Sequence, residues 1–302
     1  MARNRAANVG ASVRARLLNR ARVEHSDFQI LLTRYALERL LYRLSVSSYR
    51  EQFILKGAML FTTWVNDRFR PTRDLDLLGF GDDSPAAIAV AFRAICSQPV
   101  EDDGVIFDIE RLEAAPIRED VEYGGVRVRT RATVAAARLP IQVDVGFGDA
   151  ITPAPVEIDY PPLLDAPVAR LRAYPVETVV AEKFEALVRL GIANSRLKDF
   201  YDLWLISRTF SFDHCILAGA VRRTFANRDM PLPIELPTGL TAAYAETWMS
   251  QWQAFLGRER MAAVPSSLDT VVIDLGQFLM PLMAAGNASL RWAPETGWIG
   301  DA

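Results

Sequence analysis

Two aspartates alternate with two leucines at the end of the stretch Arg70-Pro71-Thr72-Arg73-Asp74-Leu75-Asp76-Leu77. Because successive side chains of a β-strand point to opposite faces, we expect Asp74 and Asp76 to project together from one face. Two carboxylates held side by side repel each other unless a cation lies between them. Mg²⁺ prefers a few carboxylates together with substrate phosphates, so the pair predicts a magnesium site. A lone Asp-x-Asp is common, and the prediction therefore depends on what else the chain supplies.

Asp144 is a third candidate metal ligand. It lies in Ile141-Gln142-Val143-Asp144-Val145, a strand pattern that buries the apolar residues and turns Asp144 to the opposite face. Three carboxylates on one side of a sheet suit two Mg²⁺ ions that orient a nucleoside triphosphate for in-line displacement at phosphorus. Instead of binding metal, Asp144 could act as the general base. It could also have a purely structural role, as a hydrogen-bonded residue at the end of a strand.

Gly57 follows a short buried strand, Phe53-Ile54-Leu55, and precedes a helix expected over residues 58–65. Backbone N–H groups at a helix N-terminus attract phosphate oxygens, and a glycine lacks the side chain that would block a close approach. The turn is thus a candidate phosphate site, although a glycine before a helix is often only a turn.

Further along the chain, Lys183 lies between Glu182 and Glu185 on an expected helix. Lys198 and Asp202 are four residues apart and would share a helix face. Taken alone, these residues favour a solvated lysine and a surface ion pair.

Positive charge is concentrated near the N-terminus. Through residue 50 there are ten arginines against three acids, whereas residues 101–122 carry nine acids against two arginines. Such asymmetry favours one electropositive surface able to hold phosphates, with a solvated basic helix as the alternative. Arg127, Arg129 and Arg131 would place three more arginines on one strand face, as candidate RNA-backbone contacts.

Composition narrows the class of protein. The 302 residues are half hydrophobic, carry a net charge of −3, and include only Cys96 and Cys215, which argues against a disulfide framework or a zinc site. No apolar run approaches a membrane span or a signal core, so we expect a soluble, cytoplasmic protein. The chain has no Gly-x-Ser-x-Gly, Walker-type or Gly-x-Gly-x-x-Gly pattern, which disfavours serine hydrolases, P-loop enzymes and dinucleotide oxidoreductases.

The order of expected elements predicts an α+β protein of two domains, residues 1–160 and 161–302. Helices over residues 11–23, 28–46 and 86–96 accompany strands in the first half, and a proline-rich passage at residues 153–175 favours a linker or an edge segment. Helices are then expected over residues 176–190, 195–207, 213–226, 241–256 and 267–285. We expect the last dozen residues to be loosely held.

Four of these stretches together resemble the AbiEii/AbiGii toxin family of nucleotidyltransferases, the toxin halves of bacterial toxin-antitoxin pairs. The family's first motif is a Lys-Gly turn followed by Arg-x-Thr-x-Asp-Leu-Asp-Leu, matched here by Lys56, Gly57 and residues 70–77. The later motifs are a strand carboxylate, a helical lysine and Arg-x-Lys-Asp-x-Tyr-Asp-Leu, matched by Asp144, Lys183 and residues 196–203. The chain departs from the family at Ala58, where Gly or Ser is usual, so a hydroxyl contact to phosphate is lost there.

The resemblance implies a polymerase-β-like nucleotidyltransferase domain, with a mixed sheet flanked by helices, followed by a mainly α-helical domain and an active cleft between them. It implies Mg²⁺ bound by Asp74, Asp76 and Asp144, with Lys183 and Asp199 completing the catalytic set. The implied nucleotide contacts are Lys56, Gly57, Ala58, Arg73, Lys183 and Asp202. The reaction would transfer a nucleoside monophosphate from an NTP to the 3′ end of tRNA and so block aminoacylation and growth, and a cognate antitoxin would be encoded beside the toxin.

Two rival functions stay open at this point. One is nucleotidyl transfer to a protein or small-molecule hydroxyl, and the other is a catalytically inert module that binds nucleotide or RNA. The residues also leave open whether Asp199 or Asp202 is the catalytic carboxylate of the last motif.

Overall fold

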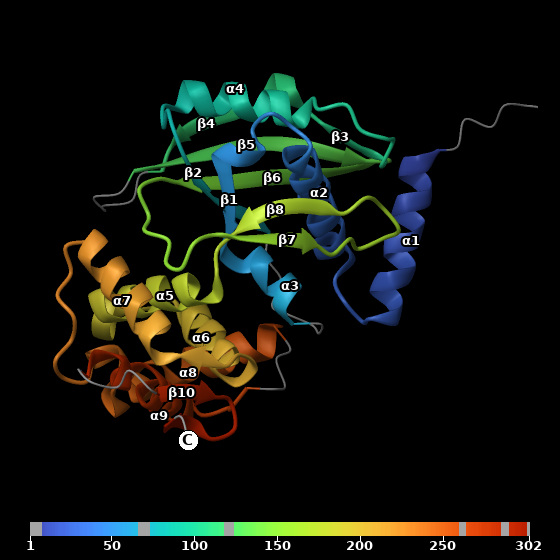
Figure 1. Ribbon diagram of the computed structural model, residues 1–302. Coiled ribbons are helices and arrows are strands. Elements are labelled where there is room, and N and C mark those ends of the chain that lie inside the picture. The colour runs from blue at the N-terminus through green and yellow to red at the C-terminus, as the bar shows by residue number, and fades with distance from the viewer. Residues whose placement is uncertain (1–7, 66–72, 118–123, 260–263, 285–289, 301–302) are drawn as a thin grey trace, which may run out of the picture. The chain divides into compact units, whose positions relative to one another are not determined.

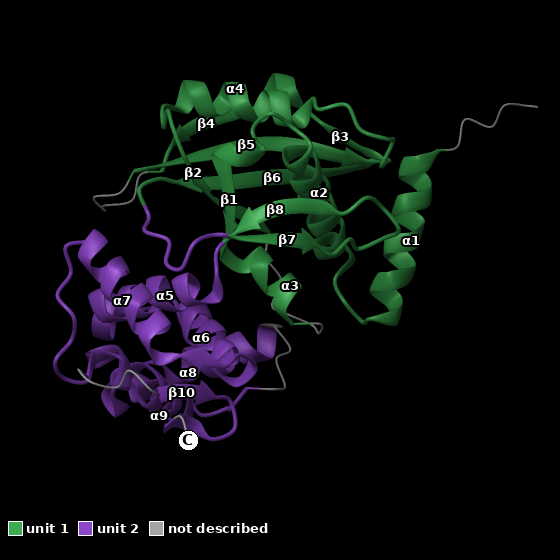
Figure 2. Ribbon diagram, viewed as in Figure 1, with its two compact units in different colours: residues 1–148, 156–173 green, residues 149–155, 174–302 purple. Residues whose placement is uncertain are grey.

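The computed structural model describes residues 8–65, 73–117, 124–259, 264–284 and 290–300. The chain forms two compact units, and Figure 2 colours them separately. Unit 1 contains Met1–Gly148 and Val156–Ala173, and unit 2 contains Asp149–Pro155 and Tyr174–Ala302. This division differs from the boundary expected at residue 160, because the proline-rich passage contains two strands that add to the sheet of unit 1.

Unit 1 is built on a mixed sheet of eight strands (Figure 1), whose order is β3-β5-β6-β2-β1-β8-β7, with β4 paired to β5. The strands are β1 (Phe53–Lys56), β2 (Asp74–Gly79), β3 (Val105–Phe107), β4 (Glu113–Pro116), β5 (Gly125–Val134), β6 (Ala137–Gly146), β7 (Val156–Tyr160) and β8 (Ala169–Ala173). The pairs β2–β6 and β1–β8 are parallel, and the other pairs are antiparallel.

Helices α2 (Phe28–Ser45) and α4 (Pro85–Cys96) pack against the strands, and α1 (Val9–Val23) packs against α2. The side chains of Asp27 and Ser84 cap α2 and α4 by accepting a hydrogen bond from a backbone N–H, as N-cap residues do. The helix expected over residues 58–65 is present over residues 57–64, but only its second half is α-helical. It consists of a 3₁₀ turn, Gly57–Leu60, followed by a single α-helical turn, α3 (Phe61–Trp64).

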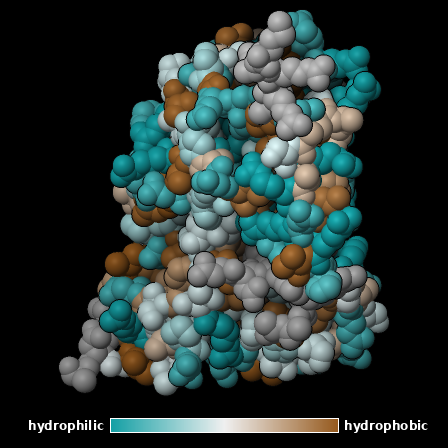
Figure 3. All heavy atoms as spheres, turned by 90° about the vertical axis from the view of Figure 1, so that its right-hand side faces the viewer, coloured by the Kyte–Doolittle hydropathy of each residue, from teal (hydrophilic) through white to brown (hydrophobic). Residues whose placement is uncertain are grey.

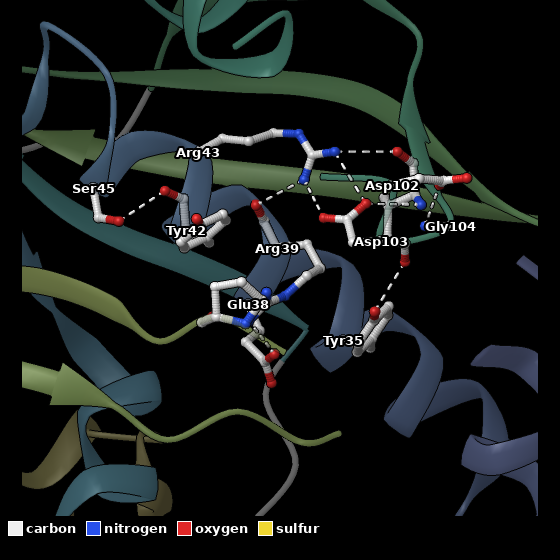
Figure 4. Close-up of polar contacts among 11 residues, drawn as sticks. Tyr35, Glu38, Arg39, Tyr42, Arg43, Ser45, Asp102, Asp103 and Gly104 are labelled. Carbon is white, nitrogen blue, oxygen red and sulfur yellow. Dashed lines mark hydrogen bonds and ion pairs between the residues drawn. The ribbon is translucent and has the colours of Figure 1, made fainter. Parts of the chain in front are cut away.

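A buried ion pair on α2 ties this helix to the loop between β7 and β8 (Figure 4). Glu38 and Arg39 are both fully buried, and Arg39 Nη2 lies 2.6 Å from Glu38 Oε1. The Leu163 amide donates to Glu38, and Arg39 donates to the Pro167 carbonyl. Burial raises the pKa of Glu38, and the adjacent guanidinium partly offsets this effect. The pair therefore holds two segments together at the cost of desolvating both charges.

Unit 2 is mainly helical and consists of α5 (Val176–Leu190), α6 (Leu197–Thr209), α7 (His214–Asn227), α8 (Ala242–Glu259) and α9 (Leu268–Leu279). The bounds predicted for α5 are confirmed, since Pro175 precedes its first turn and Gly191 ends it with a positive φ of 53°. The expectation of a loosely held C-terminus is wrong. There β10 (Leu290–Ala293) and β11 (Gly297–Gly300) form a small sheet with β9 (Phe212–Asp213), and the Trp292 indole donates to the Ser207 carbonyl.

The α+β architecture with a helical second part is thus confirmed. Among the described residues, no helix is both long and apolar enough to cross a membrane.

Removing one partner of the buried pair on α2 should be strongly destabilising. We expect Arg39→Met to lower the free energy of unfolding by about 3–5 kcal/mol, because it leaves the Glu38 carboxylate buried without its counter-ion. The double variant Glu38→Gln/Arg39→Met should recover a large part of this loss, because the unpaired charge is gone. Urea unfolding of both variants measures the effect, and equal losses in the single and the double variant would contradict the account.

Candidate active site

The strand pairing of unit 1 places four charged residues side by side on one sheet face. Lys56 lies opposite Asp76, Asp76 lies opposite Asp144, and Asp144 lies opposite Arg127. Directly paired residues point to the same face, so these side chains form one row across β1, β2, β6 and β5. All four are half-buried, whereas their chain neighbours on β2 and β6, such as Leu75 and Val143, are buried on the opposite face. We call these four residues the charged row.

Asp144 is held by Arg127 in a bidentate ion pair. Arg127 Nε lies 2.8 Å from Asp144 Oδ1, and Arg127 Nη2 lies 2.7 Å from Asp144 Oδ2. Fork-to-fork contacts of this kind are among the stronger ion pairs because two charge-assisted hydrogen bonds fix the geometry. The structure therefore places Arg127, predicted as an RNA contact, against the carboxylate predicted as a metal ligand.

Asp74 lies at the exposed start of β2, on the same face as Asp76 and opposite Gln142. Within the residues that the structure describes, no three acidic, histidine or cysteine side chains gather as a metal-ligand set. Mg²⁺ commonly takes only one or two carboxylates and completes its shell with phosphates and water, so Asp74 and Asp76 fit such a cation. Arg73 is exposed just before β2, and the predicted motif residues Arg70, Pro71 and Thr72 lie outside the described residues.

Gly57 is required by the position of Asp76. It has a φ of +74°, and a Cβ built on it would lie 2.1 Å from Asp76 Oδ2, far inside contact distance. Any side chain at position 57 would therefore displace the Asp76 carboxylate as well as strain the backbone. The next residue, Ala58, is buried within the 3₁₀ turn. The local sequence thus brings the expected phosphate turn and one expected metal ligand together.

In unit 2, Lys183 on α5 is bound by two carboxylates of α6. Its Nζ lies 2.6 Å from Asp199 Oδ1 and 2.9 Å from Asp202 Oδ2. Both aspartates are buried, whereas Lys183 keeps 16% of its side chain exposed. The expectations of a solvated Lys183 and of a surface pair between Lys198 and Asp202 are therefore wrong. The motif's aspartates converge on one ammonium because positions 199 and 202 lie on the same helix face.

The charge on Asp199 is stabilised by its neighbours. Burial opposes ionisation of this carboxyl, but the positive charges of Lys183 and Arg196 outweigh that effect and lower its pKa. Arg196 Nε lies 2.9 Å from the second carboxylate oxygen. The group is therefore ionised at neutral pH and forms an ion pair with Lys183.

A second ionic cluster in unit 2 was not predicted from the sequence. Arg228, which follows α7, lies 3.2 Å from Asp149 and also binds Glu182 and Glu185 of α5. The Tyr174 hydroxyl lies 3.2 Å from both Asp149 and Glu182. This cluster fixes one side of α5 while Lys183 faces α6. No local signal connects Arg228 with residues 43 or more positions earlier.

The remaining predicted RNA contacts differ in their surroundings. Arg129 and Arg131 are exposed on the same face of β5 as Arg127, and Arg129 lies opposite Glu113 and Gln142. Helix α1 exposes Arg14, Arg16 and Arg22. Figure 3 views the side on which α1 lies in Figure 1, and hydrophobic residues are scattered there among hydrophilic ones.

Two glycines with positive φ allow a matched test of the contact between Gly57 and Asp76. Gly81 has a φ of +92°, but its nearest neighbour, Gln52 Nε2, is 3.6 Å from a built Cβ. We expect Gly81→Ala to cost about 1 kcal/mol of stability from backbone strain alone. Gly57→Ala should cost roughly 1–3 kcal/mol more, because the methyl group collides with Asp76. Denaturant unfolding measures both variants, and equal costs would argue against the close approach.

The ion pairs of Lys183 predict a pH-dependent effect of its removal. Lys183→Met should destabilise the protein by about 3 kcal/mol at neutral pH, because it leaves Asp199 and Asp202 buried without this cation. The lowered pKa of Asp199 gives the wild-type protein stability that is present above the carboxyl's ordinary pKa and lost as the pH falls through the lowered one. The difference between wild type and variant should therefore shrink in acid.

The control for this experiment is Lys198→Met, since Lys198 is exposed on the same helix as Asp199. We expect it to change stability by no more than about 0.5 kcal/mol. Urea unfolding over a series of pH values provides the measurement. A loss in Lys183→Met that stayed constant down to low pH would be evidence against the ion-pair account.

Comparison with solved structures finds a provisionally assigned nucleotidyltransferase from Helicobacter pylori, with 12% sequence identity and a TM-score of 0.45, covering 83% of this chain and 92% of that one. A second is JHP933 from Helicobacter pylori, at 12% identity and a TM-score of 0.42, with 83% of this chain and 90% of that one covered. No curated protein matches the chain in this comparison.

The family model described as the nucleotidyl transferase AbiEii toxin of a type IV toxin-antitoxin system matches residues 39–273. The match includes both the charged row and the Lys183 site, and it confirms the resemblance inferred from the motifs. Nucleotidyl transfer is the activity of this family. The chain belongs to the AbiEii nucleotidyl transferase toxin family of type IV toxin-antitoxin systems.

Proposed function

We propose that this protein is a Mg²⁺-dependent toxin that transfers a nucleoside monophosphate from an NTP to the 3′ end of tRNA. The observation that carries the proposal is the register between β2 and β6, which sets Asp76 beside Asp144 while Gly57 closes on Asp76. Adjacent carboxylates next to a backbone turn are the elements that a cation with a triphosphate requires.

Asp74 and Asp76 would hold the cation, and Asp144 lies beside them as a third ligand or as the general base for the incoming hydroxyl. When bound, Mg²⁺ supplies positive charge that orients the phosphates and stabilises charge on the leaving pyrophosphate. Gly57 leaves room for the phosphates to approach the backbone, and Lys56, Ala58 and Arg73 complete the proposed nucleotide contacts.

Lys183 is proposed as the second cation for the triphosphate. Its position between Asp199 and Asp202 supports this role, because the two carboxylates fix the direction of the ammonium group. Asp199 and Asp202 then act through Lys183, and we propose Asp199 as the member of the pair that completes the catalytic set by positioning Lys183, because it also binds Arg196.

The proposed acceptor is the 3′ end of a tRNA. The exposed Arg129 and Arg131 and the arginines of α1 support contacts to the RNA backbone, whose affinity would fall as salt rises. Blocking the acceptor end would prevent aminoacylation in the cytoplasm, and a cognate antitoxin would restrain the activity. Transfer to a protein or small-molecule hydroxyl, or inert binding of nucleotide or RNA, are the competing functions.

Labelled NTPs distinguish these functions directly. We expect the full chain, incubated with each labelled NTP, Mg²⁺ and a cell lysate, to label tRNA, and chelation of the metal to abolish the label. Asp76→Asn should reduce transfer by about a hundredfold or more, because the cation loses a charged ligand.

Asp159→Asn is the matched control, since Asp159 is exposed on β7 and should keep full activity. If the label appeared on a protein or a small molecule instead, that molecule would be the acceptor in place of tRNA. The absence of any label, or full transfer by Asp76→Asn, would overturn the proposed mechanism.

A further inference from the structure

The charged row has an ordered sequence of charges. Across β1, β2, β6 and β5 it runs Lys56, Asp76, Asp144, Arg127, so two carboxylates lie between two cations. The formal charges of the row sum to zero. Two neighbouring carboxylates that would otherwise repel each other are thereby compensated from the outer strands.

Arg127 differs from the other arginines of its strand. Arg129 and Arg131 are exposed, whereas Arg127 is half-buried and binds both oxygens of Asp144. A carboxylate has about four lone-pair sites, so Arg127 leaves Asp144 able to accept a further partner. Arg127 therefore does not block a cation from reaching Asp144, but its positive charge repels that cation.

We propose that Arg127 is a positioning residue that sets the divalent-cation affinity of the charged row. This inference rests on the function proposed above. With Arg127 in place, the four residues of the row carry no net charge, and only Asp74 adds a negative charge beside them, so a free divalent cation is attracted weakly. A cation bound to a triphosphate forms a negatively charged complex, which Arg127 attracts. Arg127 thus favours uptake of the metal–nucleotide complex over uptake of the metal alone.

Titration of the full chain with Mn²⁺, followed by electron paramagnetic resonance, tests the inference without measuring transfer. Arg127→Met removes the charge, and we expect Mn²⁺ to bind on the order of fivefold more tightly, with the gain shrinking as salt rises. Arg127→Lys restores the charge and should return the affinity to within about twofold of wild type. Arg138→Met, at an exposed position six residues before Asp144 on β6, should leave the affinity unchanged.

Arg127→Gln is a second charge-neutral variant that can still donate to Asp144, and it should tighten Mn²⁺ binding as Arg127→Met does. Thermal unfolding establishes that each variant is folded. Mn²⁺ affinity that is unchanged or weaker in the folded neutral variants would overturn the role of Arg127 while leaving the proposed function intact. If the folded wild-type protein and variants bind no Mn²⁺, either alone or together with a non-hydrolysable NTP analogue, the metal site and the inference are overturned together.

Discussion

The repulsion between two neighbouring carboxylates is the interaction that the sheet of unit 1 has to accommodate. The parallel pairing of β2 and β6 places Asp76 directly beside Asp144, and buried leucines and valines on the opposite face fix that register. A slip of one residue would turn the carboxylates into the core. Lys56 and Arg127 compensate the pair from the flanking strands, so the sheet tolerates an arrangement that is unfavourable by itself.

Unit 2 also contains neighbouring carboxylates, but there one cation lies between them. Lys183 forms ion pairs with the buried Asp199 and Asp202, and Arg196 binds the second oxygen of Asp199. Arg228 and its acidic partners fix the neighbouring side of α5. Each unit thus keeps charged groups at partly buried positions by pairing them with opposite charges.

Local sequence patterns predict the helices, the strands and most candidate site residues, but they do not predict which side chains contact each other. The bounds of α5 are readable from Pro175 and Gly191, and the strand of Asp74 from its alternation. The pairing of Arg127 with Asp144 depends on a two-residue turn at Ala135 and Ala136, where Ala135 adopts a positive φ without the usual glycine or asparagine. The contacts of Lys183 with Asp199 and Asp202 join separate helices, so helical spacing alone suggested a surface pair instead.

The proposed function requires that the Asp76 and Asp144 carboxylates, beside Gly57, bind a divalent cation that is coordinated by the triphosphate of the nucleotide. Anomalous diffraction from crystals grown with Mn²⁺ and a non-hydrolysable NTP analogue tests it most directly. The account predicts a manganese peak within about 2.1 Å of an Asp76 oxygen. It also predicts that the phosphates of the analogue contact the backbone of the Gly57 turn. A manganese ion and nucleotide bound elsewhere, with the Asp76 and Asp144 carboxylates making no contact to either, would contradict it.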